Sequence, residues 1–360
     1  MEAAAYDLIV AGAGPAGSAC AITAARAGAR VLLLEKDRFP RQKVCGEFVS
    51  PESLALLQTL MGEGKLQFHT PVDSVRIFVD GKCLTLPVRP AAQSIPRFEL
   101  DARLFASAKR AGAVGREETT IHAVCRKREM FQVETSAGAF TARSVVNATG
   151  RWSKLTQFEV ATKEKWLGLK AHFTELSPPS SVDLYFFPGG YCGVTPVDSK
   201  TVNACAMVRA DAARSLEEVF ANHPELRQRS RDWQPLFPSV STSPLYFREP
   251  ETEGDGMLLA GDSAAFIDPF AGDGISLALQ SGTLAADALV SFIDGKYSLA
   301  QAQQQYRQSY KKRFTPAFRN AARLRSALAA PKWIRSATLA FAGIPGVGRM
   351  LLQGTRAREF

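Results

Sequence analysis

A glycine-rich segment close to the start of the chain has the residue types that bind the pyrophosphate of a dinucleotide. Gly12, Gly14 and Gly17 are spaced as G-x-G-x-x-G and follow an apolar stretch, residues 6–10, that is typical of a buried strand. Gly12 permits a tight turn, Gly14 lets a phosphate approach the backbone, and Gly17 lets a helix pack closely on the strand. Free N–H groups at the start of such a helix bind phosphate oxygens. The expected binding residues of this loop are Gly12, Gly14, Pro15, Ala16 and Gly17.

A second apolar stretch, residues 31–34, ends directly at Glu35, which is followed by Lys36. An acid about twenty residues beyond the glycine loop accepts hydrogen bonds from the adenosine ribose. The order of strand, turn, helix and strand is the context that a dinucleotide fingerprint requires. These residues predict a Rossmann-type domain, but they do not distinguish FAD from NAD.

Two further segments carry residues suited to a flavin. Residues 257–260 form an apolar strand that leads into Gly261 and Asp262, and a Pro- and Gly-containing loop then precedes an apolar helix from Ile275. The positive N-terminal end of such a helix stabilises the negative charge of a reduced flavin. Earlier in the chain, Arg97 and Asp101 are spaced as R-x-x-L-D-x-x-L.

Together these three segments resemble the FAD-dependent superfamily of p-hydroxybenzoate hydroxylase and geranylgeranyl reductase. The resemblance covers residues 7 to 293. It implies that Asp262 binds the flavin ribityl chain, that the loop from Pro269 lies beside the isoalloxazine, and that Arg97 contacts FAD. The remaining residues that it implies for the cofactor are Glu35, Lys36, Gly150, Gly261, Gly272, Asp273, Gly274 and Ile275.

Residues 39–46 read F-P-R-x-K-x-C-G and are similar to a segment of the geranylgeranyl reductase branch. The resemblance implies that Arg41, Cys45 and Gly46 lie near the flavin. Cys45 and the adjacent Glu47 are candidate catalytic residues, although a buried structural thiol and a loop carboxylate are the alternatives.

The segment around Tyr191, the third candidate catalytic residue, departs from this branch. Prenyl reductases carry Y-x-W-x-F-P there, whereas Gly193 and Thr195 replace both large aromatic rings in this chain. This change enlarges the expected pocket and argues against reduction of an isoprenoid chain in the same way. No second G-x-G-x-x-G follows a strand, so electrons are expected from NAD(P)H that docks transiently or from a separate flavin reductase.

We therefore expect an FAD-dependent monooxygenase that acts on a hydrophobic aromatic or polyketide-like molecule through a flavin C4a-hydroperoxide. The alternative is an FAD-dependent carbon–carbon double-bond reductase of the geranylgeranyl reductase type. A flavin-dependent halogenase or a non-catalytic flavoprotein fits the pattern less well.

The expected fold class is α/β, with a glutathione reductase-like Rossmann domain, an antiparallel substrate sheet and a helical C-terminal tail. The FAD-binding domain is predicted at 1–70, 97–160 and 254–295, the substrate domain at 71–96 and 161–253, and the tail at 296–360.

The positive charge of the chain is concentrated in the tail. Residues 301–360 hold twelve Lys or Arg and one acid, whereas the whole chain has a net charge of +9. Nucleic acid is therefore not an expected partner of the catalytic body. The tail can bind an acyl-carrier protein or an anionic membrane surface, or it can cap the substrate lobe with a solvated basic face.

Scattered cysteines and histidines predict neither a disulfide framework nor a metal site. The six cysteines show no C-x-x-C pair, and the four histidines have no metal-ligand spacing. The chain is therefore expected in a reducing cytoplasm, with a peripheral position on the membrane if the tail binds lipid.

Overall fold

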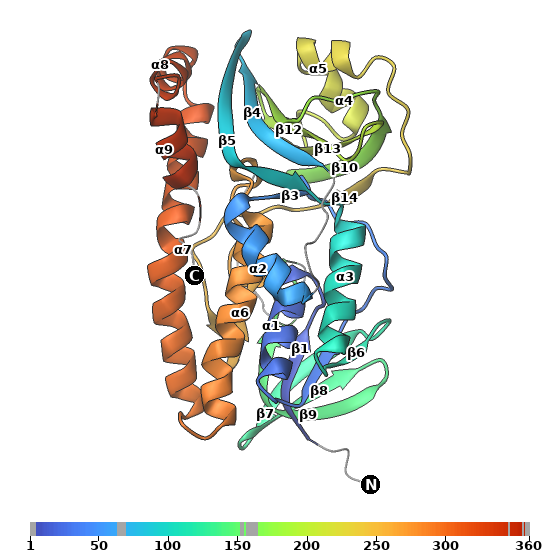
Figure 1. Cartoon of the computed structure of the whole chain (residues 1–360), viewed down its shortest axis with the longest axis vertical. Helices are drawn as coiled ribbons and strands as arrows, with labels where there is room; N and C mark the ends of the chain where they lie inside the picture. The colour runs from blue at the N-terminus through green and yellow to red at the C-terminus, as the bar shows by residue number, and fades with distance from the viewer. Residues whose placement is uncertain are drawn as a thin grey trace.

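Two β-sheets, one above the other, organise the molecule (Figure 1). The computed structural model describes residues 5–62, 70–151, 155, 165–344, 346–354 and 356. The expected domain boundary at 160 falls outside these ranges, so the division into domains stays a prediction.

The lower sheet is the Rossmann-type unit predicted from the glycine loop. Its strands run in the order β15-β16-β9-β1-β2-β6, and β7 and β8 extend it from β9. The central strands are parallel and apolar because they are buried on both faces. Their bounds are β1 Tyr6–Ala11, β2 Val31–Leu34, β6 Val114–Arg116, β7 Ile121–Lys127, β8 Met130–Thr135, β9 Gly138–Asn147, β15 Glu253–Gly254 and β16 Met257–Leu259.

Four helices pack around this sheet: α1 (Pro15–Arg26), α2 (Pro51–Met61), α3 (Arg97–Arg110) and α6 (Gly274–Ile293). Small residues let α1 and α6 touch through their backbones. An ideal Cβ added to Gly282 of α6 would lie 2.0 Å from the carbonyl oxygen of Ala16 in α1. The two helices that follow the expected cofactor motifs are thus fixed against each other.

The upper sheet is mostly antiparallel, in the order β14-β10-β13-β12-β11-β4-β5-β3. Side chains alternate between its two faces, as the strand period requires. The outer face packs with α4 (Leu216–Ala221) and α5 (Pro224–Arg229). The strands are β3 Phe48–Val49, β4 Pro71–Val79, β5 Lys82–Ser94, β10 Trp166–Thr174, β11 Ser181–Phe187, β12 Gly190–Pro196, β13 Thr201–Arg209 and β14 Val240–Thr242.

The inner face of the upper sheet turns toward the lower sheet, and its residues form cross-strand rows. One row holds Leu184, Gly193, Cys205 and Lys170, and the next holds Phe186, Tyr191, Met207 and Gly168. Direct neighbours on adjacent strands have Cβ atoms about 5 Å apart. This face therefore forms the roof of the space in which a substrate would lie.

The tail is helical, as expected, and consists of α7 (Leu299–Ala329), α8 (Lys332–Ala342) and α9 (Val347–Gly354). Tyr306, Tyr310 and Phe314 of α7 are fully buried in the core of the lower lobe. The first part of the tail therefore packs on the lower lobe and not on the substrate lobe that the capping alternative named, and binding of the tail to a partner or membrane stays a prediction. The α/β fold class with its Rossmann unit, antiparallel sheet and helical tail is confirmed.

Within the described ranges, α6 has the length and apolarity that could cross a membrane. However, 72% of its most apolar window is buried in the protein. Here α6 serves as a core helix of the lower lobe.

Candidate cofactor and substrate site

The glycine loop between β1 and α1 is built for close backbone approach. The N–H of Gly12 donates to Leu34 at 2.8 Å, and a Cβ on Gly17 would lie 1.8 Å from the Gly12 carbonyl oxygen. Gly14, in contrast, faces open space, and the atom nearest to its ideal Cβ is a guanidinium nitrogen of Arg97 at 3.9 Å. The loop therefore places an uncovered backbone next to a positive charge, as an anionic ligand requires.

Glu35 closes the loop from the end of β2. Its carboxylate accepts hydrogen bonds from the N–H groups of Ala13 at 3.0 Å and Asp37 at 3.1 Å, and from Arg41 at 3.0 Å. The side chain is buried, which fits an acid that orients both the loop and a ribose. Lys36, in contrast, is exposed.

Arg41 does not reach the glycine loop directly. Its guanidinium joins Glu35 to Asp101, to which it donates at 2.7 Å. Asp101 in turn receives two hydrogen bonds from Arg97, both 2.8 Å long. The fully buried Asp101 thus holds Arg97 in place beside Gly14, and Arg41 braces the pair.

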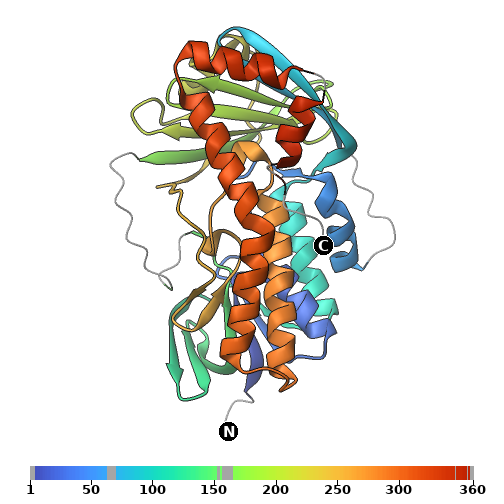
Figure 2. The same ribbon diagram turned by 90° about the vertical axis from the view of Figure 1, so that its left-hand side faces the viewer.

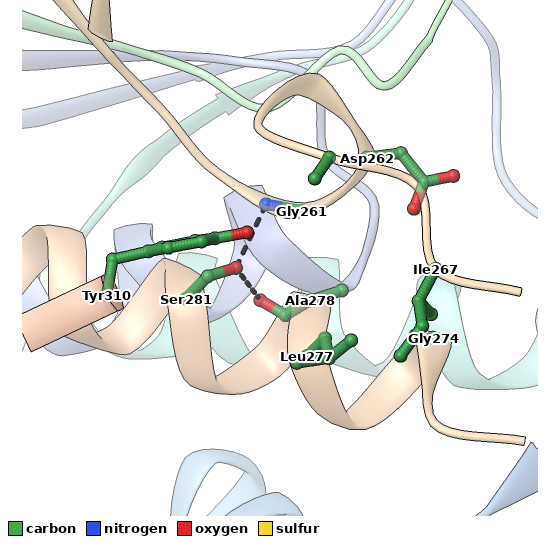
Figure 3. A pocket seen from close by; sticks show the side chains of 9 residues that line it. Gly261, Asp262, Ile267, Gly274, Leu277, Ala278, Ser281 and Tyr310 are labelled. Atoms are coloured by element: carbon green, nitrogen blue, oxygen red, sulfur yellow. Dashed lines mark hydrogen bonds between the residues drawn. The ribbon is translucent and has the colours of Figure 1, made fainter. Parts of the chain in front are cut away.

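The second motif lies at the start of α6, after β16. The N–H of Gly261 donates to the hydroxyl of Ser281 at 2.9 Å, and that hydroxyl donates to the carbonyl of Ala278 at 3.2 Å. Figure 3 shows these bonds at a small pocket, with Asp262 directed away from them. Asp262 is partly exposed and lies 3.4 Å from the guanidinium of Arg151.

The two motifs meet at Ala16. An ideal Cβ on Gly261 would lie 2.9 Å from the Cβ of Ala16, the residue whose carbonyl also touches Gly282. Neither α1 nor α6 has a side-chain N-cap. Because the first N–H groups of a helix have no partner within the helix, both N-termini can donate to a ligand.

These residues fit FAD. Gly14 leaves room for a pyrophosphate beside Arg97. A buried nitrogen of Arg151, next to Asp262, has no hydrogen-bond partner in the described part of the chain. Gly150 is held close by, since its N–H donates to the hydroxyl of Ser263 at 2.9 Å. The loop η2 (Pro269–Ala271), Gly272 and Asp273 would border the flavin ring, and α6 would direct its N-terminus at it.

The Cys45–Glu47 segment connects the two lobes. Asn203 of β13 donates to the carbonyl of Cys45 at 3.0 Å, and Lys170 of β10 donates to Glu47 at 2.5 Å. His172, also of β10, lies 2.7 Å from the second oxygen of Glu47. Both charged side chains of the Lys170–Glu47 pair have no exposed surface.

Glu47 is therefore saturated with partners. It also accepts the backbone N–H of Arg97 at 2.8 Å. Burial alone would raise the pKa of the Glu47 carboxyl, but the hydrogen bond from His172 and the charge of Lys170 outweigh it and lower that pKa. The carboxylate is built to stay charged and to position neighbours. Its catalytic role stays a prediction.

Tyr191 lies at the junction of β12 with the cofactor loop. Its ring packs against Phe186 of β11, with centroids 5.3 Å apart, and against Phe270 of η2. Burial raises the pKa of its phenol well above the ordinary value, and the nearby Cys205 and Asp268 add to the rise. Tyr191 is therefore a neutral hydroxyl at every physiological pH.

Asp268 precedes η2 and is tied to the tail by Arg325, which donates to it at 2.9 Å. Burial raises the pKa of Asp268 to about 6, against the opposing charge and hydrogen bond of Arg325. Arg356, beyond α9, donates to the carbonyl of Gly272 at 3.2 Å. The tail thus contacts the loop expected beside the flavin.

The sequence motifs did not identify every residue of this site. Arg151 directly follows Gly150 and could have been considered from that position, whereas Lys170 and His172 are ordinary residues of a strand. The residues added by the structure are Asp101, Arg151, Lys170, His172, Phe270, Gly282, Arg325 and Arg356. Across the described ranges, no group of His, Cys, Asp or Glu could hold a metal ion.

Comparison with known proteins gives the same picture. A family model described as an FAD binding domain matches residues 5–323. Menaquinone reductase of Mycobacterium tuberculosis is 30% identical over 322 residues, which cover 79% of this chain and 76% of the relative. Digeranylgeranylglycerophospholipid reductase 2 of Methanopyrus kandleri is 26% identical over 343 residues, or 88% and 85% of the two chains.

Solved structures confirm the fold. A geranylgeranyl bacteriochlorophyll reductase-like protein of Thermoplasma acidophilum superposes with a TM-score of 0.81 at 21% identity, over 98% of this chain and 95% of that one. Flavin-dependent halogenases share the fold as well.

Proposed function

This chain belongs to the FAD binding domain family and is an FAD-dependent oxidoreductase, and from this premise we propose that it reduces a carbon–carbon double bond in an isoprenoid-bearing lipid. Menaquinone reductase and digeranylgeranylglycerophospholipid reductase, which are similar to this chain over most of its length, support reduction of such a lipid. Oxygen insertion, the first expectation from the sequence, stays an untested prediction that we rank second.

The apolar roof supports a lipid substrate. The cluster on the inner face of the upper sheet includes buried Val182, Leu184 and Met207. Partly exposed aromatic rings border it, namely Trp166, Phe186, Phe247, Phe266 and Phe270. Burial of a hydrocarbon chain against such a surface is favourable because it removes apolar area from water.

Gly193 gives this roof a hollow. It is partly exposed, although Tyr191 and Thr195 on either side of it in β12 are buried. An added Cβ would meet only Leu184 at 3.4 Å and the Cys205 carbonyl at 3.7 Å. Prenyl reductases were expected to carry an aromatic ring at the position of Gly193, and this chain leaves that volume open. The open volume fits a substrate group bulkier than a single prenyl chain.

The buried phenol of Tyr191 is the observation that carries the proposal. Reduced FAD held at this site would supply the hydride for one carbon of a double bond. The other carbon then requires a proton from a positioned acid. Tyr191 is protonated and lies on the inner face of the roof beside the Phe270 loop, so its hydroxyl can donate that proton. The rings of Phe186 and Phe270 exclude water around it.

Other acids on this side of the roof are less suitable. Glu47 is saturated with donors and stays charged. The sulfur of Cys45 accepts the backbone N–H of Glu47 at 3.3 Å. Cys45 stays a second candidate acid.

Anaerobic turnover tests the proposal. The reduced holoenzyme is mixed under anaerobic conditions with menaquinone or a geranylgeranyl lipid. The molecular mass of the product is then measured by mass spectrometry. A gain of two hydrogen atoms is expected. Tyr191→Phe should slow this step by about 100-fold or more while FAD reduction is unchanged.

Tyr185→Phe is the matched control. Tyr185 lies on the outer face of the same sheet, with its hydroxyl 3.1 Å from Arg229. This variant should keep full turnover. A product that contains an added oxygen atom and forms only in air would contradict the reductase proposal and support the monooxygenase.

A further inference from the structure

Exposed apolar side chains are concentrated at one place on the surface. Among the residues whose side chains the structure describes, eight large hydrophobic residues are exposed, and four of these lie between Trp333 and Met350. Trp333 is 72% exposed and Phe341 is 55% exposed. Single exposed apolar residues are ordinary, but a cluster marks an interaction site.

The cluster follows the geometry of α8. Trp333, Ala337 and Phe341 are spaced four residues apart, so they lie on one face of the helix, and all three are exposed. Ile344, just beyond the end of α8, is also exposed. We call Trp333, Ala337, Phe341 and Ile344 the apolar stripe.

The opposite side of α8 is fixed to the protein. Arg335 donates two hydrogen bonds to Asp80 at the tip of the β4–β5 hairpin, at 2.6 and 2.9 Å. Close by, α9 packs so tightly on β5 that a Cβ on Gly348 would lie 2.4 Å from Leu86. The apolar stripe is therefore held outward and cannot turn into the core without breaking these contacts.

Exposed basic residues accompany the stripe. Lys332 adjoins Trp333, and Arg319 and Arg323 are exposed on α7, the helix that leads into α8. In the described part of the chain none of these three has an ion-pair partner. Figure 2 shows α7 and α8 together in the foreground, on the outer side of the molecule.

We propose that this surface, formed by the apolar stripe with Lys332, Arg319 and Arg323, docks the protein on an anionic phospholipid bilayer. Trp333 and Phe341 enter the boundary between headgroups and acyl chains, where aromatic rings are favoured. The three basic side chains contact lipid phosphates. The twelve Lys or Arg against one acid in residues 301–360 match a negative membrane surface.

The charge argues against the other occupants of this surface. A symmetric second copy would bring the same basic tail face to face, and like charges repel. An acidic carrier protein would satisfy the charges, but a partner helix is recognised by a groove between elements, whereas the stripe lies along a single helix, α8. A bilayer, in contrast, binds a single amphipathic helix through its apolar face.

This inference does not depend on the reaction proposed above, because it rests on the surface and not on the site. The test uses the full-length holoenzyme and vesicles of phosphatidylcholine with or without phosphatidylglycerol. We expect sedimentation with the anionic vesicles only, a loss of binding in high salt, and a blue shift of tryptophan emission. Trp333→Phe should still bind and should lose the shift.

Two matched pairs of variants locate the surface. Trp333→Gln with Phe341→Gln should weaken binding about tenfold or more, whereas Leu176→Gln with Leu236→Gln changes two exposed residues elsewhere and should not. Arg319→Glu with Arg323→Glu should weaken binding by roughly fivefold per charge removed, or more, unlike Lys127→Glu with Arg231→Glu. The FAD spectrum and melting temperature confirm that each variant is folded.

Several results would overturn the proposal. Equal binding to neutral and anionic vesicles would show that charge does not drive binding. An equal loss of vesicle binding in both members of a matched pair would show that α8 is not the docking surface. Failure of the wild type to bind vesicles, with capture of an acidic carrier protein instead, would assign the surface to that protein. A dimer that Trp333→Gln with Phe341→Gln dissociates would assign it to a second copy.

Discussion

The rings of Tyr191 and Phe270 meet edge to face across the junction of the two lobes, with centroids 6.0 Å apart and planes at 83°. Tyr191 belongs to the roof sheet, whereas Phe270 belongs to the loop that leads into α6. Aromatic pairs in this geometry are favourable beyond their buried area. The contact between Tyr191 and Phe270 therefore holds the upper sheet in position over the cofactor loop. The same two residues would contact the substrate.

Arg97 should be required for tight FAD binding. Its guanidinium lies beside Gly14 and its side chain is only 14% exposed, so its hydrogen bonds to a phosphate would be strong. We expect Arg97→Met to raise the dissociation constant of FAD by about 10- to 100-fold. Arg103→Met, on the exposed side of the same helix, is the control. Fluorescence titration of the apoprotein would show equal affinities if Arg97 does not touch FAD.

Lys170 should matter for stability more than an ordinary lysine does. Lys170→Met leaves the charge of Glu47 buried beside His172 alone, and breaking such a pair costs about 3–5 kcal/mol of unfolding free energy. Adding Glu47→Gln should recover part of this loss. Urea denaturation measures the unfolding free energy of each variant, and Lys200→Met on the surface is the control. A loss no larger than that of Lys200→Met would contradict the assigned role.

Asp268 should give stability a pH dependence below neutrality. Its pKa rises from 3.8 in the unfolded chain to about 6 in the fold, so the folded protein holds this proton more tightly. Stability contributed by the protonated group is complete below pH 3.8 and is lost as the pH rises through about 6. The unfolding free energy lost over this pH range amounts to about 3 kcal/mol.

Thermal unfolding across this range, compared with Asp268→Asn, checks this expectation. The difference between the two proteins should change between about pH 4 and pH 6. Because Arg325 lowers the pKa of Asp268, Arg325→Met should move the change to higher pH. A constant difference would show that Asp268 is charged throughout.

Gly193 should control the size of the substrate. The hollow admits a methyl group at ordinary contact distances, so Gly193→Ala should be tolerated. Gly193→Trp should lower kcat/KM for a bulky lipid about tenfold or more, while FAD affinity is unchanged. Steady-state kinetics with short and bulky prenyl substrates measures the effect. An equal loss for both would indicate a folding defect instead of selection by size.

Local motifs were predictable from the sequence because their function depends on neighbouring residues. Gly12, Gly14 and Gly17 lie close together at the turn into α1, and Asp262 lies shortly after the end of β16 at Leu259. The Lys170–Glu47 pair could not be predicted in this way, since 123 residues separate the partners. Lys170 occupies a strand position whose side faces the other lobe, and only the register of β10 with β13 shows this.

The tail was ambiguous in the sequence for a different reason. Tyr306 and Phe314 on α7 and Trp333 on α8 are all large and apolar, and all lie among basic residues. The first two are buried against the lower lobe, while Trp333 is exposed. Burial depends on which surface lies opposite each helix, and composition does not contain that information.

The order of strands in the lower sheet has a consequence for synthesis of the protein. β1 leads into the glycine loop at Gly12, but β16, which extends the same sheet, ends at Leu259, and α6 follows only at Gly274. Translation therefore exposes the dinucleotide loop long before its partner helix exists. A chain that terminates before Gly274 would carry the fingerprint without α6, so a complete flavin site requires segments from both ends of this sheet's sequence range.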